Sequence, residues 1–180
     1  ARAARPRLVR GDGVTSGLDA VVGAQLLALL AELRRSLDLA YLFISHDLST
    51  VRAVCDEVVI LYAGERVETA SQAAFRAPPL HPYADLLLAS IPELRVGWLD
   101  AIPRRAEAEA ASAVARAKTA SGCAFVGRCP VAIPVTCASR TPPERRTSGG
   151  ARILCHRTAE ELAEAQRRDP DHPAAGQPAR

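Results

Sequence analysis

The sequence has no methionine, few aromatic residues and no long hydrophobic run. Aromatic residues make up 4% of the chain and the net charge is only +3, so neither the stacking surfaces nor the basic stripe of a nucleic-acid-binding protein is present. No stretch approaches the roughly 18 apolar residues that cross a bilayer, and residues 1–10 lack the apolar core of a signal peptide. We therefore expect a cytoplasmic protein that binds no nucleic acid. The missing methionine indicates a sequence that begins partway into a longer protein.

The composition allows a folded core. With 180 residues and 48% hydrophobic content, the chain is long enough for one sizeable core with an extension. Five cysteines in a chain without an export signal point to metal binding or reactivity more than to disulfides. Four of them lie between residues 123 and 155, whereas Cys55 stands alone and is expected to be a small buried hydrophobe.

The first part of the chain has the pattern strand, helix, strand. Residues 7–11 resemble a short strand, and residues 40–45 (AYLFIS) form the continuous apolar run of a strand covered on both faces. Between them, residues 20–37 carry apolar side chains at the spacing of one helix face, with Asp19 placed as an N-cap. Two strands joined by a helix predict a parallel βαβ unit.

The following residues extend this α/β domain to about residue 75. Residues 46–55 predict a turn and a short helix, residues 57–69 two strands around a turn, and residues 71–76 a helical turn. The fold class we expect is therefore α/β, with a parallel sheet in a domain at residues 1–75.

Residues 76–180 predict an extension that is mostly irregular. A short helix opens at Pro82, residues 104–120 are alanine-rich, and the tail at residues 170–180 is expected to be disordered. Thr158 and Glu161 have the spacing of a capping box before a last helix. The cysteine-bearing part has little periodicity, so something other than an apolar core is expected to order it.

Two polar residues end the two predicted parallel strands. Asp12 ends the first strand and His46 follows the second, and ligands of open parallel sheets bind beyond the carboxyl ends of the strands. A carboxylate there suits a hydrated Mg²⁺, and an imidazole suits a terminal phosphate oxygen or an attacking water. Taken alone, Asp12 with Gly13 is equally well a turn, and His46 a lead-in to a capped helix.

The order of these features resembles the second half of the nucleotide-binding domain of ABC transporters. In LVRGDGVTSGLD (residues 8–19), Asp12 matches the Walker B aspartate and SGLD, from Ser16 to Asp19, matches the D-loop; His46, after YLFIS, matches the switch histidine. The resemblance implies a P-loop-type fold that binds ATP and Mg²⁺. It assigns Asp12 to Mg²⁺, Ser16 and Asp19 to the nucleotide site at the dimer interface, and His46 to catalysis at the γ-phosphate.

A second resemblance narrows the family. PLHPYADLLLASIP (residues 79–92) is similar to the segment that follows the nucleotide-binding domain in ATP-binding subunits of bacterial oligopeptide and dipeptide importers. This resemblance implies partners: a second ATP-binding subunit and transmembrane permease subunits. It also implies a peripheral position on the inner face of the cell membrane, with the peptide substrate not bound directly.

Four cysteines are spaced as C-x5-C-x7-C-x17-C at Cys123, Cys129, Cys137 and Cys155. Their thiolates could bind zinc or an iron-sulfur cluster, and the wide spacing suits a cluster better than zinc, which prefers closely spaced pairs; free thiols are the third alternative. SGCAFVGRCP and LCH match the extension of the same importer subunits, and this resemblance implies a [4Fe-4S] cluster.

Two motifs of an active ATPase do not occur in the sequence. There is no G-x-x-x-x-G-K-[ST] phosphate loop and no LSGGQ-type signature, and Gly13 stands where the family has its catalytic glutamate. Whether the protein is an enzyme is therefore open. The leading interpretation is a C-terminal portion of a peptide importer ATPase with a degenerate site; the alternatives are a noncatalytic metal-binding interaction module and the product of a decaying gene.

Overall fold

The computed structural model of the chain describes residues 6–90 and 121–167. Its contacts divide the chain into two units, Ala1–Cys55 and Asp56–Arg180. The strands at residues 57–69, which the sequence analysis grouped with the first domain, fall in the second unit because they pair with a strand beyond residue 150. The alanine-rich segment at residues 104–120 and the tail at residues 170–180 lie outside the described residues.

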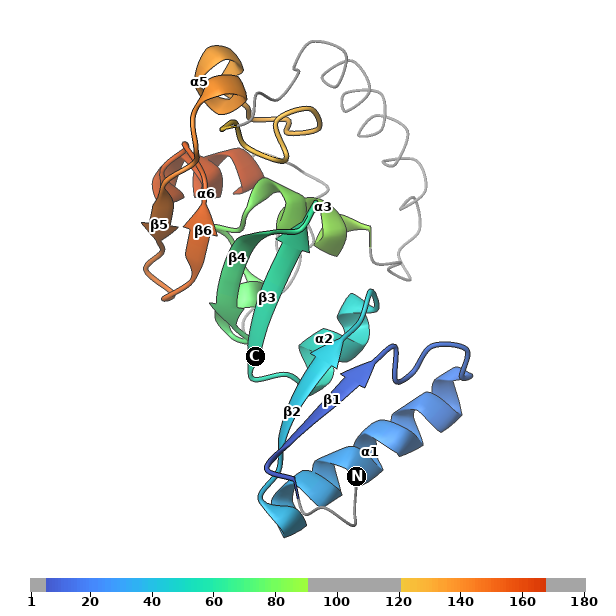
Figure 1. Cartoon of the computed structure of the whole chain (residues 1–180). Helices are drawn as coiled ribbons and strands as arrows, with labels where there is room; N and C mark the ends of the chain where they lie inside the picture. The colour runs from blue at the N-terminus through green and yellow to red at the C-terminus, as the bar shows by residue number, and fades with distance from the viewer. Residues whose placement is uncertain (1–5, 91–120, 168–180) are drawn as a thin grey trace. The chain divides into compact units, whose positions relative to one another are not determined.

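The first unit contains the predicted strand, helix and strand. They are β1 (Leu8–Asp12), α1 (Ala20–Leu37) and β2 (Ala40–Ile44), followed by the short helix α2 (Leu48–Val54). β1 and β2 pair in parallel, from Leu8 opposite Ala40 to Asp12 opposite Ile44, and α1 runs alongside the pair (Figure 1). The parallel pairing predicted from the sequence is confirmed.

Helix α1 has the predicted bounds and the predicted cap. The Asp19 carboxylate accepts hydrogen bonds from the backbone N–H groups of Val21 and Val22, at 3.0 and 2.9 Å, which satisfies two donors that the first turn of a helix leaves without partners. At the other end Asp38 adopts a left-handed conformation with φ 50° and closes the helix.

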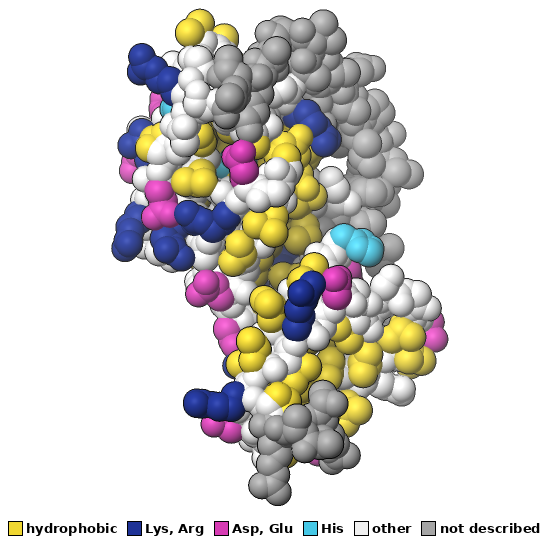
Figure 2. Space-filling view, in the orientation of Figure 1, with side chains coloured by type: hydrophobic (Ala, Val, Ile, Leu, Met, Phe, Trp, Pro, Cys, Tyr) yellow, Lys and Arg dark blue, Asp and Glu magenta, His cyan; other side chains and the backbone are white. Residues whose placement is uncertain are grey.

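Strand β2 is not covered on both faces, so that prediction was wrong. Its side chains alternate between exposed and half-buried, and Leu42 and Ile44 are 51% and 42% exposed. The physical reason is that a pair of strands with one helix beside it has only one covered face. Apolar side chains therefore lie at the surface of this unit (Figure 2).

The described residues of the first unit form no core of their own. Among its described residues only Gly23 is buried, and Cys55, expected to be buried, is only half-buried. Exposed large apolar residues occur on the strands, on α1 and in the loop before it: Leu8, Leu18, Val21, Val22, Leu29, Leu37, Leu42 and Ile44. Little apolar area is thus available to stabilise these elements.

The second unit is built on an antiparallel sheet of four strands. β3 (Glu57–Tyr62) and β4 (Glu65–Ser71) form a hairpin, and β6 (Arg152–Leu154) and β5 (Glu144–Arg146) extend it in the order β3-β4-β6-β5. The hairpin turns at Ala63 and Gly64, both at positive φ, as predicted. The resulting fold is α/β with one parallel and one antiparallel sheet.

Short helices accompany this sheet. They are the 3-10 turn η2 (Ala74–Arg76), α3 (Pro82–Ala89), α5 (Pro134–Ser139) and α6 (Ala159–Arg167). The predicted capping box is confirmed: Glu161 N–H donates to the Thr158 hydroxyl at 3.2 Å, and Thr158 N–H donates to the Glu161 carboxylate at 2.8 Å.

The core of the second unit joins its sheet, its helices and the cysteine-bearing loop. Phe75, Leu80 and Ile153 are fully buried. Phe125 and Val126, which lie between the first two clustered cysteines, are each 1% exposed. Apolar packing therefore does help to order the cysteine-bearing region, contrary to the expectation from its weak periodicity.

Candidate functional site

Asp12 and His46 lie at the same edge of the parallel strand pair. Asp12 is paired with Ile44, the last residue of β2, and the N–H of Gly13 donates to the Ile44 carbonyl at 2.9 Å. His46 follows two residues later and is exposed. The parallel register thus places both side chains at the carboxyl ends of neighbouring strands, where open sheets bind ligands.

The Asp12 carboxylate is accessible. It lies 3.6 Å from the guanidinium of Arg10, and the two side chains are 68% and 65% exposed. An ion pair so exposed contributes about 0–1 kcal/mol. A hydrated Mg²⁺ with phosphate oxygens could therefore take the place of Arg10 at little cost.

The loop after Asp12 is a tight turn that depends on glycine. Gly13 has φ +58° and Gly17 has φ +78°. Residues other than glycine adopt these backbone conformations only at an energetic cost. Ser16 N–H donates to the Gly13 carbonyl at 2.9 Å, and the Ser16 side chain is exposed. The turn delivers the chain to Asp19, whose carboxylate is engaged as the cap of α1.

Gly11 explains how this turn accommodates Val14. A Cβ atom on Gly11 would lie 2.3 Å from the Val14 Cγ2 atom and 3.4 Å from the Phe43 ring. Only glycine leaves room for that approach. The valine is therefore packed into the end of the sheet and does not point freely into solvent.

Asp47 organises the segment beside His46. Its carboxylate accepts from the backbone N–H groups of Ser49 and Thr50, at 3.0 and 3.3 Å, and from both of their hydroxyls. These hydrogen bonds, with those from the Ser49 and Thr50 hydroxyls largest, lower the pKa of Asp47. Asp47 thus stays ionised as the cap of α2 and fixes where the chain turns after His46.

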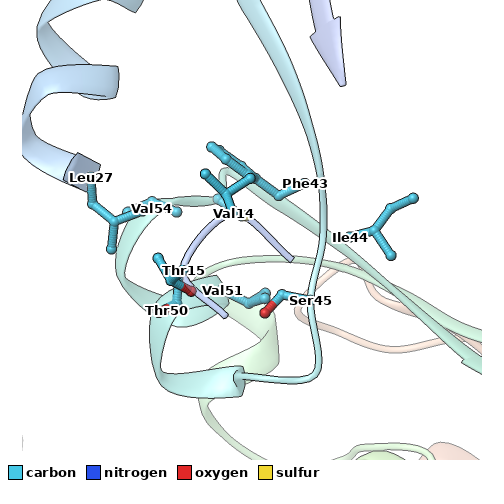
Figure 3. Close-up of a pocket in the computed structure, with 10 residues that line it drawn as sticks. Val14, Thr15, Leu27, Phe43, Ile44, Ser45, Thr50, Val51 and Val54 are labelled. Carbon is cyan, nitrogen blue, oxygen red and sulfur yellow. The ribbon is translucent and has the colours of Figure 1, made fainter. Parts of the chain in front are cut away.

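A small hollow lies among the turn after Asp12, helix α1, strand β2 and helix α2 (Figure 3). The volume open to the centre of a water molecule is about 10 Å³, which is enough for about one water. The hollow is therefore too small to be a nucleotide pocket. Its lining is mainly apolar: Val14, Thr15, Leu27, Phe43, Ile44, Ser45, Thr50, Val51, Val54 and Cys55.

The four clustered cysteines lie in the second unit, and none of them is joined in a disulfide. Cys129, Cys137 and Cys155 are buried and Cys123 is half-buried. Cys123 N–H donates to the Cys137 carbonyl at 2.8 Å, and a Cβ atom on Gly122 would lie 2.1 Å from the Ala138 carbonyl oxygen. Glycine at position 122 is thus what allows the first cysteine to lie against the third.

Backbone amides act on three of the four sulfurs. Ile133 N–H donates to the Cys137 sulfur at 3.2 Å. The backbone of Val131 lowers the pKa of Cys129, and the backbone of Arg157 and His156 lowers that of Cys155. Such amides stabilise thiolates and tune iron-sulfur centres.

The thiols also interact through their charges. Burial, chiefly, together with the neighbouring cysteines raises the pKa of Cys129 to about 12 and that of Cys155 to about 11, although backbone N–H groups lower both. Neutral thiols are thus favoured unless a cation offsets their charge. In residues 6–90 and 121–167, no group of three or more His, Cys, Asp or Glu side chains is arranged to hold a metal ion. The four cysteine thiols are suitable ligands for a metal or a cluster by their chemistry, but they are not arranged around a common centre in this structure.

Several buried polar residues in the second unit were missed by the sequence analysis. Glu68 is fully buried, and one carboxylate oxygen accepts from His81 N–H at 2.7 Å. Gln166 holds Leu80 through two hydrogen bonds, accepting from its N–H at 3.0 Å and donating to its carbonyl at 2.8 Å. The only signal in the sequence was the polar His81 inside the apolar PLHPY segment.

No helix among the described residues is both long enough and apolar enough to cross a bilayer.

Comparisons with known proteins point to one group. Residues 67–137 match the model of the oligopeptide/dipeptide transporter C-terminal region. A protein of Brucella abortus (strain 2308), which carries the name of a peptide import ATP-binding protein, is 41% identical over 157 residues, covering 87% of this chain and 44% of that protein.

Two oligopeptide transport ATP-binding proteins are also similar. AppF of Bacillus subtilis (strain 168) is 35% identical over 151 residues, 84% of this chain and 45% of AppF. OppD of Escherichia coli (strain K12) is 35% identical over 164 residues, 88% of this chain and 45% of OppD. The chain therefore spans less than half the length of these relatives. It belongs to the family of ATP-binding proteins of oligopeptide and dipeptide ABC transporters and corresponds to a C-terminal portion of such a subunit.

Proposed function

We propose that the chain forms the magnesium and γ-phosphate side of a nucleotide site in the ATP-binding subunit of a peptide importer, which energises transport by binding and hydrolysing ATP. The observation that carries this proposal is the parallel register that puts Asp12 and His46 at one edge of the sheet. The names of the relatives, which refer to ATP binding and to peptide import or oligopeptide transport, support it.

Each predicted site residue has a distinct role in this proposal. Asp12 holds Mg²⁺ through water, as Mg²⁺ commonly keeps part of its hydration shell. His46 donates to the γ-phosphate or positions the attacking water. Ser16 and Asp19 lie in the loop that faces a second ATP-binding subunit, and the permease subunits are the other partners. The subunit would act at the inner face of the membrane without touching the peptide.

Gly13 makes the site a poor catalyst. A carboxylate that activates the attacking water contributes about 10²- to 10⁴-fold to a rate, and glycine contributes none of it. We therefore assign this half-site to nucleotide binding more than to turnover, with hydrolysis left to the site of the partner subunit.

The cysteines are proposed to hold a [4Fe-4S] cluster through Cys123, Cys129, Cys137 and Cys155. When bound, such a cluster supplies a one-electron redox centre and cross-links the loops that carry its ligands. The amides that act on three of the sulfurs support this reading. A noncatalytic module that binds zinc through the same thiols is the second candidate, favoured by the burial of three of them.

Metal analysis separates the two candidates. After anaerobic purification, about four irons and four sulfides per chain, with a brown colour, would support the cluster. One zinc per chain in a colourless protein would support the zinc module. Absence of both metals would overturn both.

Nucleotide binding is tested with the chain and with a hybrid. In the hybrid, this chain replaces the stretch of Escherichia coli OppD that it matches, and MgATP affinity is measured by calorimetry. We expect micromolar affinity for the hybrid and none for the chain alone, because the 180 residues contain no phosphate-binding loop. Micromolar binding by the isolated chain, or no binding by a folded hybrid, would contradict the proposal.

A further inference from the structure

The side chain of His81 is tied in two directions. His81 is 1% exposed; its Nδ1 accepts from the N–H of Tyr83 at 3.1 Å, and its ring also interacts with the backbone of Leu154, which raises its pKa against the larger effect of burial. The first contact caps α3, and the second reaches β6 directly before Cys155. One imidazole therefore connects the start of a helix with the strand that leads into the fourth clustered cysteine.

The backbone of His81 adds a third connection. Its N–H donates to the Glu68 carboxylate on β4 at 2.7 Å, and Leu80 before it is held at both backbone groups by Gln166 of α6. The position of the imidazole is thus fixed by two elements besides its own helix. Because the backbone on both sides of the ring is held by these hydrogen bonds, the imidazole of His81 has little freedom to move.

Phe125 connects the same place to the first two cysteines. It lies between Cys123 and Cys129 and is 1% exposed. Its ring centroid is 5.0 Å from that of Tyr62, 5.3 Å from Tyr83 and 5.9 Å from His81. These are the separations of favourable aromatic pairs, so the loop is anchored by its phenylalanine against β3 and α3.

The remaining cysteine follows from these contacts. Cys137 is bonded through its carbonyl to the N–H of Cys123. Every segment that carries a clustered cysteine is therefore linked to α3, either through Phe125 or through Leu154.

We propose that His81 is a positioning residue for the cysteine site, which it assembles before any metal is bound by holding the approach to Cys155 and the Phe125 loop. Naming the cysteines as ligands rests on the proposed function; the positioning role does not, because it concerns the metal-free protein. The burial that lowers the pKa of His81 to about 4 keeps the ring neutral near pH 7, as the hydrogen bond that Nδ1 accepts from Tyr83 N–H requires.

The test is the labelling rate of each cysteine in the reduced, metal-free full chain, followed by mass spectrometry with N-ethylmaleimide under native conditions. His81→Asn keeps a side chain that caps α3 but is too short for Leu154. We expect Cys155 to label about tenfold faster, as for the loss of one buried hydrogen bond, while Cys55 in the first unit is unchanged. Phe125→Leu should instead accelerate Cys123 and Cys129.

Val58→Ala is the matched control, because Val58 is buried in β3 at 4% exposure and is paired with Ala70 of β4. Its effect on overall stability is compared with that of His81→Asn by urea unfolding. Faster labelling of Cys155 in His81→Asn than in Val58→Ala supports positioning. Equal rates in the two variants, or a rate unchanged from the parent chain, would overturn it. Metal content of the parent chain tests the cluster separately, so the two proposals fail independently.

Discussion

Gly13 is the residue that sets the catalytic rate in our account. Gly13→Glu in the OppD hybrid supplies the missing carboxylate, and a Cβ atom there has room, with Ser16 Cβ 3.5 Å away. Its φ of +58° costs a side chain about 1 kcal/mol, so we expect ATP turnover to rise by at least about tenfold, short of the full 10²- to 10⁴-fold.

Gly13→Gln is the control for that measurement, because it brings the same backbone strain and nearly the same volume without a base. Turnover is followed by phosphate release at saturating MgATP. Equal rates for the glutamate and glutamine variants would show that position 13 does not face the attacking water.

We predict that Glu68 makes the folded chain less stable as pH rises. Desolvation, chiefly, raises its pKa from 4.5 to about 8, with a smaller contribution from the charge of Asp85. The folded chain keeps the proton that the unfolded chain releases near pH 4.5, so the stabilising effect is complete below that pH and is lost as pH rises through about 8. The loss amounts to up to about 5 kcal/mol.

Glu68→Gln should remove this dependence, because the amide supplies an acceptor for His81 N–H and needs no proton. Urea unfolding at pH 6 and pH 9 measures the effect on the second unit. His81 affects stability at low pH instead. Its pKa is lowered to about 4, so stability is lost as pH falls from 6.5 towards 4, both in the parent chain and in Glu68→Gln. An alkaline loss of stability that persists in Glu68→Gln would show that another group causes it.

Some residues of the site were predictable from sequence and others were not. Asp12 and His46 could be placed at one edge because a βαβ unit determines strand direction. Glu68, His81 and Gln166 could not, since their burial depends on partners 13 to 86 residues away. Composition and periodicity carry no information on such contacts.

At the scale of elements, α1 depends on its N-cap. Asp19→Ala removes two hydrogen bonds to the first turn, which should cost about 1 kcal/mol and lower the hydrogen-exchange protection of α1 amides by about fivefold. Asp19→Asn keeps an acceptor oxygen and should change it little. If both variants lose protection equally, the charge of Asp19 matters more than its hydrogen bonds.

The elements were predicted well where the pattern was local. The periodicity of α1, the apolar run of β2 and the turn of the β3–β4 hairpin all appear in the sequence itself. β5 and β6 have three residues each, too short to show alternation, and β6 pairs with a strand some eighty residues earlier. A pairing of that separation is set by tertiary packing.

At the scale of the whole chain, the two units should differ in stability. The described part of the first unit buries no side chain, and elements that bury so little apolar area are only marginally stable in water. The second unit has a four-stranded sheet and a core that includes Phe75, Phe125 and Ile153. We expect amides of β1 and β2 to exchange at least about 100-fold faster than those of β4 in the isolated chain.

Hydrogen exchange followed by mass spectrometry checks this difference peptide by peptide. In the OppD hybrid, the strands of the first unit should become protected, because the matching family domain would cover their open face. Strong protection of β1 and β2 in the isolated chain would show that the first unit is stable without further covering.

The magnesium dependence of ATP binding tests the central claim most directly, since that claim joins Asp12 and His46 around one nucleotide. In the hybrid, ATP affinity is measured by calorimetry with and without Mg²⁺. We predict that Asp12→Asn removes the magnesium effect and that His46→Ala weakens MgATP by about tenfold or more while leaving MgADP unchanged. A hybrid in which both variants bind MgATP as tightly as the parent, with the same response to Mg²⁺, would contradict the account.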